Sequence, residues 1–240
     1  MTTSHSAHQA ASAALKDPSA GAIIASQWTL PSAGAVQAAG RAALDAMPAT
    51  PGLSRFSVYS GDEDSTLFLL SQWRNEASRD AWTRNGTATR QSVDDAVPGI
   101  RRDWRHLASP YRRFVVRAEG EPQCLVVVHQ PLDYPDARVQ RQWADVVVVA
   151  LESDDRPIPG LHAATFFPTD DGTGVLNLAE WADADSHRSA LLAGEVGPHG
   201  NLGGSPAWRA TRAVAGVAAD HAVRRYSIIG AVEPAARAGL

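Results

Sequence analysis

Residues 51–60 read Pro-Gly-Leu-Ser-Arg-Phe-Ser-Val-Tyr-Ser and residues 159–168 read Pro-Gly-Leu-His-Ala-Ala-Thr-Phe-Phe-Pro, so one tripeptide recurs at an offset of 108 positions. Without a gap, the same offset carries Asp62 onto Asp170 and Trp73 onto Trp181. In both copies an apolar run is followed by an acidic turn and by a second apolar run that ends at the Trp. Two apolar runs around a turn are typical of a β-hairpin. The repeat therefore predicts two hairpins of the same kind.

The segments around each hairpin extend it into the same larger unit. A strand and a helix are expected before each hairpin, at 22–30 and 35–47 in the first copy and at 123–130 and 136–152 in the second. After each Trp we expect a polar helical stretch, an Arg-rich helical stretch (100–106 or 206–217) and a final strand that opens at Arg112 or Arg224. The order β-α-β-β-α-β is that of the ferredoxin-like unit. The sequence predicts an α+β fold with two such repeats.

The helix at 136–152 competes with a strand, because four valines follow one another from Val146 to Val149. Val139, Trp143 and Val147 recur at the spacing of one helix face, after a possible N-cap at Asp136. The spacing favours the helix.

The repeats also predict how the chain is divided. We expect an N-terminal extension that is flexible over residues 1–20, a first repeat over 21–118 and a second over 121–233, with a linker at 118–122 that contains Gly, Pro and charges. The sheet of such a unit has one face covered by helices and one bare face. Packing the two bare faces together would make an intramolecular dimeric α+β barrel. We expect a dry chamber between the two β-layers.

Composition excludes several classes of protein. Hydrophobic residues make up 44% of the 240 residues, which suits a globular chain with a sizeable core. The net charge of -4 gives no strong attraction to nucleic acid or anionic lipid. The longest aliphatic run, 146–151, is far shorter than the ~20 residues that span a bilayer. The single cysteine, Cys124, forms no internal disulfide, and a reducing cytoplasm is the expected compartment.

With its Pro-Gly-Leu before the second strand and its Trp just ahead of an acidic helix, each repeat resembles the antibiotic biosynthesis monooxygenase family. The resemblance covers about residues 20–117 and 121–233. It implies a dimeric α+β barrel of ferredoxin-like units. Several members of the family oxidise polycyclic aromatic polyketides with dioxygen and without metal or flavin, others degrade haem, and many have no known activity.

The resemblance points to a site in the second repeat. Quinone-forming members carry an Asn four residues before the Trp of the third strand, as Asn177 stands before Trp181. The first repeat has Leu69 before Trp73 at this spacing. Residues i and i+4 of a strand share a face, so an amide and an indole would line one apolar cavity. Such a pair suits a flat aromatic ligand, held by stacking and one directed hydrogen bond.

The resemblance and the residue chemistry supply further candidates. His187 stands six residues after Trp181, where family members of this type can place an acid-base tyrosine. His162 is a second candidate to move the proton, since imidazole titrates near neutral pH. The candidates for binding the substrate are His129, Trp208, Arg209 and Trp73. No close set of metal ligands is present, so we expect no metal. Haem-degrading members place an axial His in the helix after the Trp. The corresponding positions hold Trp82 and Thr83 in the first repeat and Ala190 and Leu191 in the second, so the axial ligand of haem is missing.

Each candidate also has a structural interpretation. The two tryptophans could wedge a helix against a strand, Asn177 could satisfy backbone groups, and His187 could pair with Asp183 on a solvated helix face. His162 and His129 could be structural strand residues, and Arg209 could belong to a salt-bridged face.

Two functions stay open at this stage. One is a cofactor-independent monooxygenase that oxidises a hydroxylated polycyclic aromatic to a quinone or related product, with dioxygen as co-substrate. The other is a carrier, sensor or resistance protein that binds an aromatic metabolite without oxidising it. A small aromatic molecule is the expected partner in both, without nucleic acid or membrane, and the chain could act as a monomer or a homodimer.

Overall fold

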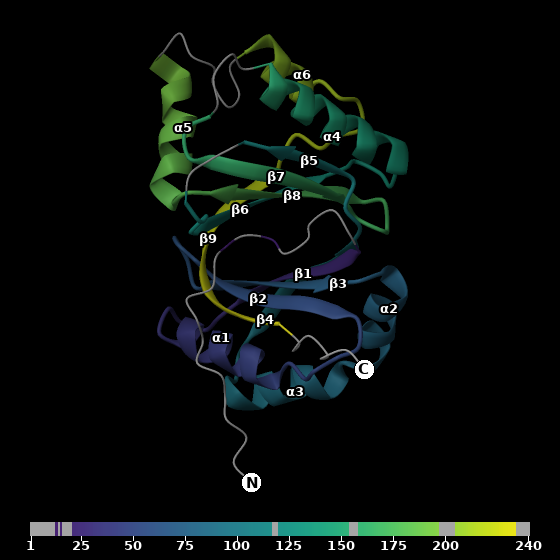
Figure 1. The fold of residues 1–240 in the computed structure, drawn as a ribbon, viewed down its shortest axis with the longest axis vertical. Coiled ribbons are helices and arrows are strands. Elements are labelled where there is room, and N and C mark those ends of the chain that lie inside the picture. The colour runs from purple at the N-terminus through teal and green to yellow at the C-terminus, as the bar shows by residue number, and fades with distance from the viewer. Residues whose placement is uncertain are drawn as a thin grey trace.

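A computed structural model describes residues 13, 15, 21–116, 120–153, 158–196 and 205–233. Figure 1 shows two β-layers in the middle of the molecule and helices at its two outer ends. No helix of the described residues is both long and apolar enough to cross a membrane.

The first half of the chain forms one layer with its helices. Its elements are β1 (Ala22–Thr29), α1 (Ala35–Ala46), β2 (Leu53–Gly61), β3 (Thr66–Trp73), α2 (Glu76–Asn85), α3 (Thr87–Ala96) and β4 (Arg101–Ala108). The strands lie in the order β4-β1-β3-β2.

The second half forms the other layer. Its elements are β6 (Cys124–Pro131), α4 (Ala137–Glu152), β7 (Leu161–Pro168), β8 (Gly174–Trp181), α5 (Ala184–Val196), α6 (Pro206–Arg212) and β9 (Ala222–Val232). Their strand order, β9-β6-β8-β7, has the same connectivity as in the first half. Both predicted hairpins are confirmed, and so is the helix after Asp136, whose carboxylate accepts hydrogen bonds from the N–H groups of Arg138 and Val139.

Two strands join the layers into one curled antiparallel sheet. Residues 222–227 of β9 pair with β6, and residues 226–232 pair with β2 of the first half. The short β5 (Arg112–Val115) pairs with β7 of the second half. The final strand of each half therefore reaches across to the other, and the complete order is β4-β1-β3-β2-β9-β6-β8-β7-β5.

The Arg-rich stretch at 100–106 was predicted as a helix, and that prediction is wrong. Helix α3 ends at Ala96, just before Pro98 and Gly99, and Gly99 has φ of 89°. The chain then runs as β4 along β1. Trp104 and His106 alternate along β4 and meet other aromatic rings, a period-2 signal that the arginines obscured. In the second half the expected helix at 206–217 ends at Arg212.

Large side chains from both halves fill the space between the two β-layers. Phe68 of β3 lies with its ring centroid 5.3 Å from Tyr226 of β9, 5.9 Å from Tyr59 and 6.1 Å from Trp104. Leu125, Val127, Phe167, Leu176 and Leu178 complete this inter-layer core from the second half. The expectation of an open chamber between the β-layers is wrong, because the rings and branched chains of both halves interdigitate there.

Part of the predicted N-terminal extension belongs to this core. Ala13 and Leu15 are buried in it. The N–H of Leu15 donates to Oε1 of Glu180 at 2.6 Å, and Arg113 contacts the other oxygen of this buried carboxylate at 3.2 Å. These contacts satisfy a carboxylate that would be costly to bury alone. The other residues of 1–20 lie outside the described part of the chain.

The repeated Pro-Gly-Leu has a structural cause. Gly52 and Gly160 have φ of 83° and 82°, which side chains of L-residues rarely adopt. A Cβ at Gly52 would lie 2.3 Å from Ser78 Oγ, and one at Gly160 would lie 2.5 Å from Ser186 Cβ. The carbonyl of each glycine also accepts a hydrogen bond from the residue after the Trp. The tripeptide thus lets the helix after each hairpin approach the turn before it.

We predict that Gly160→Ala lowers the free energy of unfolding by about 3 kcal/mol, because the backbone strain adds to a clash with Ser186. Gly120→Ala is the matched control: its φ is 81°, but nothing lies within 4 Å of the new Cβ. It should cost only about 1 kcal/mol of strain. Urea unfolding of the two variants measures the difference, and equal losses would contradict the role of the close approach.

Candidate functional site

A cavity of about 390 Å³ lies on the helix-covered face of the second half. It lies between the sheet and the helices α4, α5 and α6, on the side of β8 that carries Asn177, Ala179 and Trp181. Its other walls are Val126, Val128 and Gln130 of β6, Trp143, Val147 and Leu151 of α4, Leu161 and Ala164 of β7, His187 and Leu191 of α5, Trp208, Thr211 and Arg212 of α6, and residues 217–219, 221 and 223. This volume falls in the range of small-molecule sites. Asn177 and Trp181 were predicted to share a cavity, and they do. The cavity lies on the helix-covered face of the sheet, however, and not between the two β-layers as expected.

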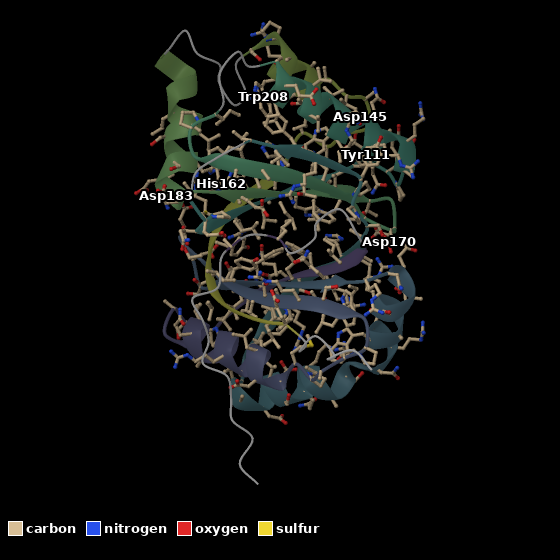
Figure 2. All side chains as sticks on the ribbon, in the orientation of Figure 1. Tyr111, Asp145, His162, Asp170, Asp183 and Trp208 are labelled. Carbon is tan, nitrogen blue, oxygen red and sulfur yellow. The ribbon has the colours of Figure 1, made fainter. Side chains whose placement is uncertain are left out.

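Among the residues that the structure describes, three polar atoms of the cavity wall are buried without a hydrogen-bond partner. They are Oδ1 of Asn177, Nε1 of Trp181 and Nε1 of Trp208. Figure 2 shows Trp208 under α6 above the second β-layer. A buried polar group without a partner costs about 1–3 kcal/mol. One acceptor and two donors around an apolar space are therefore suited to a ligand that supplies the missing hydrogen bonds.

The first half shows what the same positions do without a ligand. At the offset of 108, Ser71 corresponds to Ala179, and the Ser71 hydroxyl accepts a hydrogen bond from Nε1 of Trp73 at 2.8 Å. Leu69 takes the place of Asn177. Trp73 is buried and internally satisfied, which fits the packing interpretation of this residue. The indole of Trp181 lacks such a partner because Ala179 offers no hydroxyl.

The space in the first half is also smaller. A cavity of about 110 Å³ lies between the first β-layer and its helices, and Trp28, Phe56 and Trp82 are among the residues that line it. The second half therefore offers the larger site.

His187 lies at the wall of the 390 Å³ cavity and is buried. Its ring packs edge-on against Trp181, with the ring centroids 4.9 Å apart. Nε of Arg225 donates a hydrogen bond to Nδ1 of His187 at 3.0 Å. Burial, followed by the positive charges of Arg225 and Arg188, lowers the pKa of His187 to about 4. The imidazole is therefore neutral at pH 7, and its proton lies on Nε2.

The structural interpretation of His187 as a solvated partner of Asp183 is wrong. The carboxylate of Asp183 instead accepts a hydrogen bond from the N–H of Ser186 at 2.6 Å, at the start of α5.

The other predicted site residues are dispersed. His129 lies on the inter-layer face, with its ring centroid 4.6 Å from His106 and 5.6 Å from Trp104. His162 is half-buried on β7 (Figure 2), and Arg209 is exposed on α6. Among the residues that the structure describes, none of these three lines the cavity.

Sequence reasoning missed several residues of the cavity wall. Gln130, Thr211, Arg212 and His221 line it, and the last two are exposed. Gln130 lies on β6, whereas Thr211, Arg212 and His221 come from α6 and the loop after it, whose position over the sheet follows no periodic signal. Arg225 follows Arg224 at the start of the predicted final strand and was not named as a candidate, although its alternation with the buried Tyr226 places it on the opposite, helix-covered face.

Within the described ranges, no three or more His, Cys, Asp or Glu side chains form a group that could hold a metal ion.

We predict that acid weakens the fold through His129. Burial, followed by the neighbouring His106, lowers the pKa of His129 to about 4, whereas an unfolded histidine titrates near ~6.5. The unfolded chain therefore binds more protons between these values, so stability falls as the pH drops from about 6.5 to about 4. His129→Gln should flatten this part of the pH profile. Urea unfolding at several pH values measures it, and an unchanged slope in the variant would contradict the assignment.

Comparison with known proteins shows the fold. No family model matches the sequence, and no curated protein matches it. The chain is similar to the crystal structure of an anthrone oxidase-like protein, with a TM-score of 0.66 and 14% identity over 91% of this chain and 96% of that one. It is similar to putative monooxygenases from Lactobacillus acidophilus (TM-score 0.53, 10% identity, 89% and 97% covered) and Fusobacterium nucleatum (0.56, 8%, 89% and 95%). The α+β fold with a curled antiparallel sheet is thus one that this chain shares with monooxygenase-like proteins.

Proposed function

We propose that the protein is a cofactor-independent monooxygenase that oxidises a hydroxylated polycyclic aromatic with dioxygen to a quinone or related product. The observation that carries the proposal is the set of unpartnered polar atoms of Asn177, Trp181 and Trp208 in one apolar cavity. The volume of this cavity and its aromatic walls suit a flat ligand. The likeness to an anthrone oxidase-like structure supports the same choice.

The architecture that goes with this proposal is a tandem duplication. Two ferredoxin-like units in one chain form an intramolecular counterpart of a dimeric barrel, closed through the short connection between β4 and β5. The identical strand order of the two halves and the offset shared by the Pro-Gly-Leu motifs support this interpretation.

The residues of the cavity suit a ligand that carries both hydroxyl and carbonyl groups. Oδ1 of Asn177 accepts a hydrogen bond from a ligand hydroxyl. The indole N–H groups of Trp181 and Trp208 donate to ligand oxygens, and so does Nε2 of His187. Donors fixed in a dry site stabilise an oxygen on which negative charge develops. All four groups bind and orient the substrate, and the three N–H donors stabilise its enolate.

The chemistry balances with dioxygen alone. The enol form of an anthrone loses a proton, and the resulting enolate passes one electron to dioxygen. The radical pair then forms a carbon–oxygen bond, and protonation gives a hydroperoxide. Loss of the remaining hydrogen on that carbon as a proton, with cleavage of the O–O bond, leaves a carbonyl and releases water. The ring carbon loses four electrons, and dioxygen gains them.

The proton of the substrate needs an acceptor other than His187. Nδ1 of His187 already accepts from Arg225, and its low pKa makes it a weak base. His221 lies at the exposed part of the cavity wall, where an imidazole can pass a proton to solvent. We assign the acceptor role to His221 and the donor role to His187.

A second function is a binding protein that holds an aromatic metabolite without oxidising it. The observation that favours it is the hydrogen bond from Arg225 to Nδ1 of His187. Because Nδ1 is occupied, His187 is not available as the buried base that the sequence suggested. Tight binding without product, with or without air, is the result expected from this alternative.

Turnover of a hydroxylated anthrone by metal-free protein should require air and should yield the anthraquinone, with no effect of added flavin. Absorbance of the quinone under air and under argon measures it. Asn177→Leu, which copies Leu69 of the first half, should reduce kcat/KM by about tenfold to a hundredfold through loss of one directed hydrogen bond. Turnover that ignores dioxygen would refute the oxygenase.

Ala179→Ser should weaken binding of a dihydroxyanthraquinone by about threefold to tenfold. The new hydroxyl copies Ser71 and takes the N–H of Trp181, which then no longer needs the ligand. Ser71→Ala is the control, since it frees an indole in the half without the larger cavity. Fluorescence titration compares the two; equal effects would show that the Trp181 N–H does not contact the ligand.

A further inference from the structure

A chain of polar contacts links His187 to the first half of the molecule. Nη1 of Arg225 contacts Oε1 of Glu63 at 2.8 Å, and Nε of the same guanidinium donates to Nδ1 of His187 at 3.0 Å. Glu63 belongs to the turn between β2 and β3, whereas Arg225 and His187 belong to the second half. Arg188 of α5 also reaches the same Glu63 oxygen, at 3.2 Å. The carboxylate of one half therefore holds the guanidinium that contacts the histidine of the other.

The other half contains a corresponding pair of charged groups, which lies outside the wall of its cavity of about 110 Å³. Arg79 of α2 corresponds to His187 at the offset of 108 and is buried. It contacts Asp170 at 2.6 Å, in the turn between β7 and β8, and Figure 2 shows Asp170 beside the first half. In this half a guanidinium binds the carboxylate directly. In the second half the guanidinium belongs to Arg225 of β9, and the imidazole of His187 lies between it and the cavity.

The order of these groups determines which ring nitrogen carries a proton. A guanidinium has donors only and no acceptor, so Nδ1 of His187 must present its lone pair to Arg225. The ring of the neutral histidine then carries its hydrogen on Nε2. A carboxylate in the place of Arg225 would hold the hydrogen on Nδ1 and leave Nε2 as a base. His187 lines the cavity and Arg225 does not, and Nδ1 is occupied by Arg225, so Nε2 is the ring nitrogen left for a ligand.

We propose that Arg225, held by Glu63, is a positioning residue that fixes His187 as an Nε2–H hydrogen-bond donor to an oxygen of the bound ligand. The identity of the ligand rests on the function proposed above, and the tautomer rests on the contacts of Arg225 with His187 and Glu63. The charged groups around the ring are Arg225, Arg188 and Glu63, and the net effect of the two guanidinium groups is to disfavour a second proton. The site thereby favours ligand oxygens that accept a hydrogen bond or carry negative charge.

The test uses the full chain labelled with nitrogen-15 at histidine. Two-bond nitrogen–proton correlation spectra at pH 7 should show His187 protonated at Nε2 and unprotonated at Nδ1. Arg225→Met removes the donor and should give a mixture of the two tautomers with a raised pKa, whereas Arg225→Lys keeps a donor and should restore the Nε2–H form. Arg188→Met is the matched control, because it removes the other arginine on Glu63 without a hydrogen bond to His187.

Binding of a dihydroxyanthraquinone supplies the second measurement. Arg225→Met should weaken it by about tenfold, and Arg225→Lys should recover most of the loss. If the Arg225 variants do not fold, Glu63→Gln takes their place, with a smaller shift of the tautomer expected in the same direction.

The outcomes separate the two proposals. An Nδ1–H tautomer in the unmodified protein, or unchanged spectra in Arg225→Met, overturns the positioning role whether or not the ligand binds. A correct tautomer that responds to Arg225→Met, in a protein that binds no anthraquinone, leaves the positioning of the ring supported and refutes the proposed ligand.

Discussion

The packing of the two β-layers against each other is the constraint on which the rest of the structure depends. Phe68, Tyr59 and Tyr226 meet between the layers, and branched side chains of β6, β7 and β8 fill the remaining space. Each buried ring contributes about 2–3 kcal/mol, so an open chamber there would cost several such contributions. Space for a ligand is therefore left on the outer faces, under the helices. This is why Asn177 and Trp181 can share a cavity although the centre of the molecule is solid.

The two halves of the chain solve the same packing problem with different polar residues. In the first half Ser71 satisfies Trp73, and Arg79 binds Asp170. In the second half Ala179 leaves Trp181 without a partner, and His187 binds Arg225. At these positions the polar groups of the first half are paired, whereas Trp181 of the second half keeps an unsatisfied N–H at the wall of a cavity. The hydrogen bond from Trp73 to Ser71 indicates the kind of partner that a ligand would supply to Trp181.

The sequence alone predicted the elements that obey a simple period or a repeated motif. The hairpins, the helix after Asp136 and the shared face of Asn177 and Trp181 all follow from alternation, spacing or the Pro-Gly-Leu turn. Residues 100–106 were misassigned because their arginines suggested a helix while Trp104 and His106 carried the alternation of a strand. The face on which the cavity opens could not be predicted, since strand alternation tells which residues lie together and not which of two layers covers them. Arg225 was missed as a site residue because its partners, Glu63 and His187, lie far away in the sequence.

The long β9 has a consequence for how the molecule can be divided. Residues 222–227 complete the sheet of the second half, while residues 228–232 hydrogen-bond only to β2 among the strands described. A polypeptide cut down to the C-terminal half would therefore end in a bare ladder of N–H and C=O groups, open to any extended chain that met it. It would also lack Glu63. Separating the two halves would therefore expose an unpaired strand edge on each, and His187 of the C-terminal half would lose the carboxylate that holds Arg225.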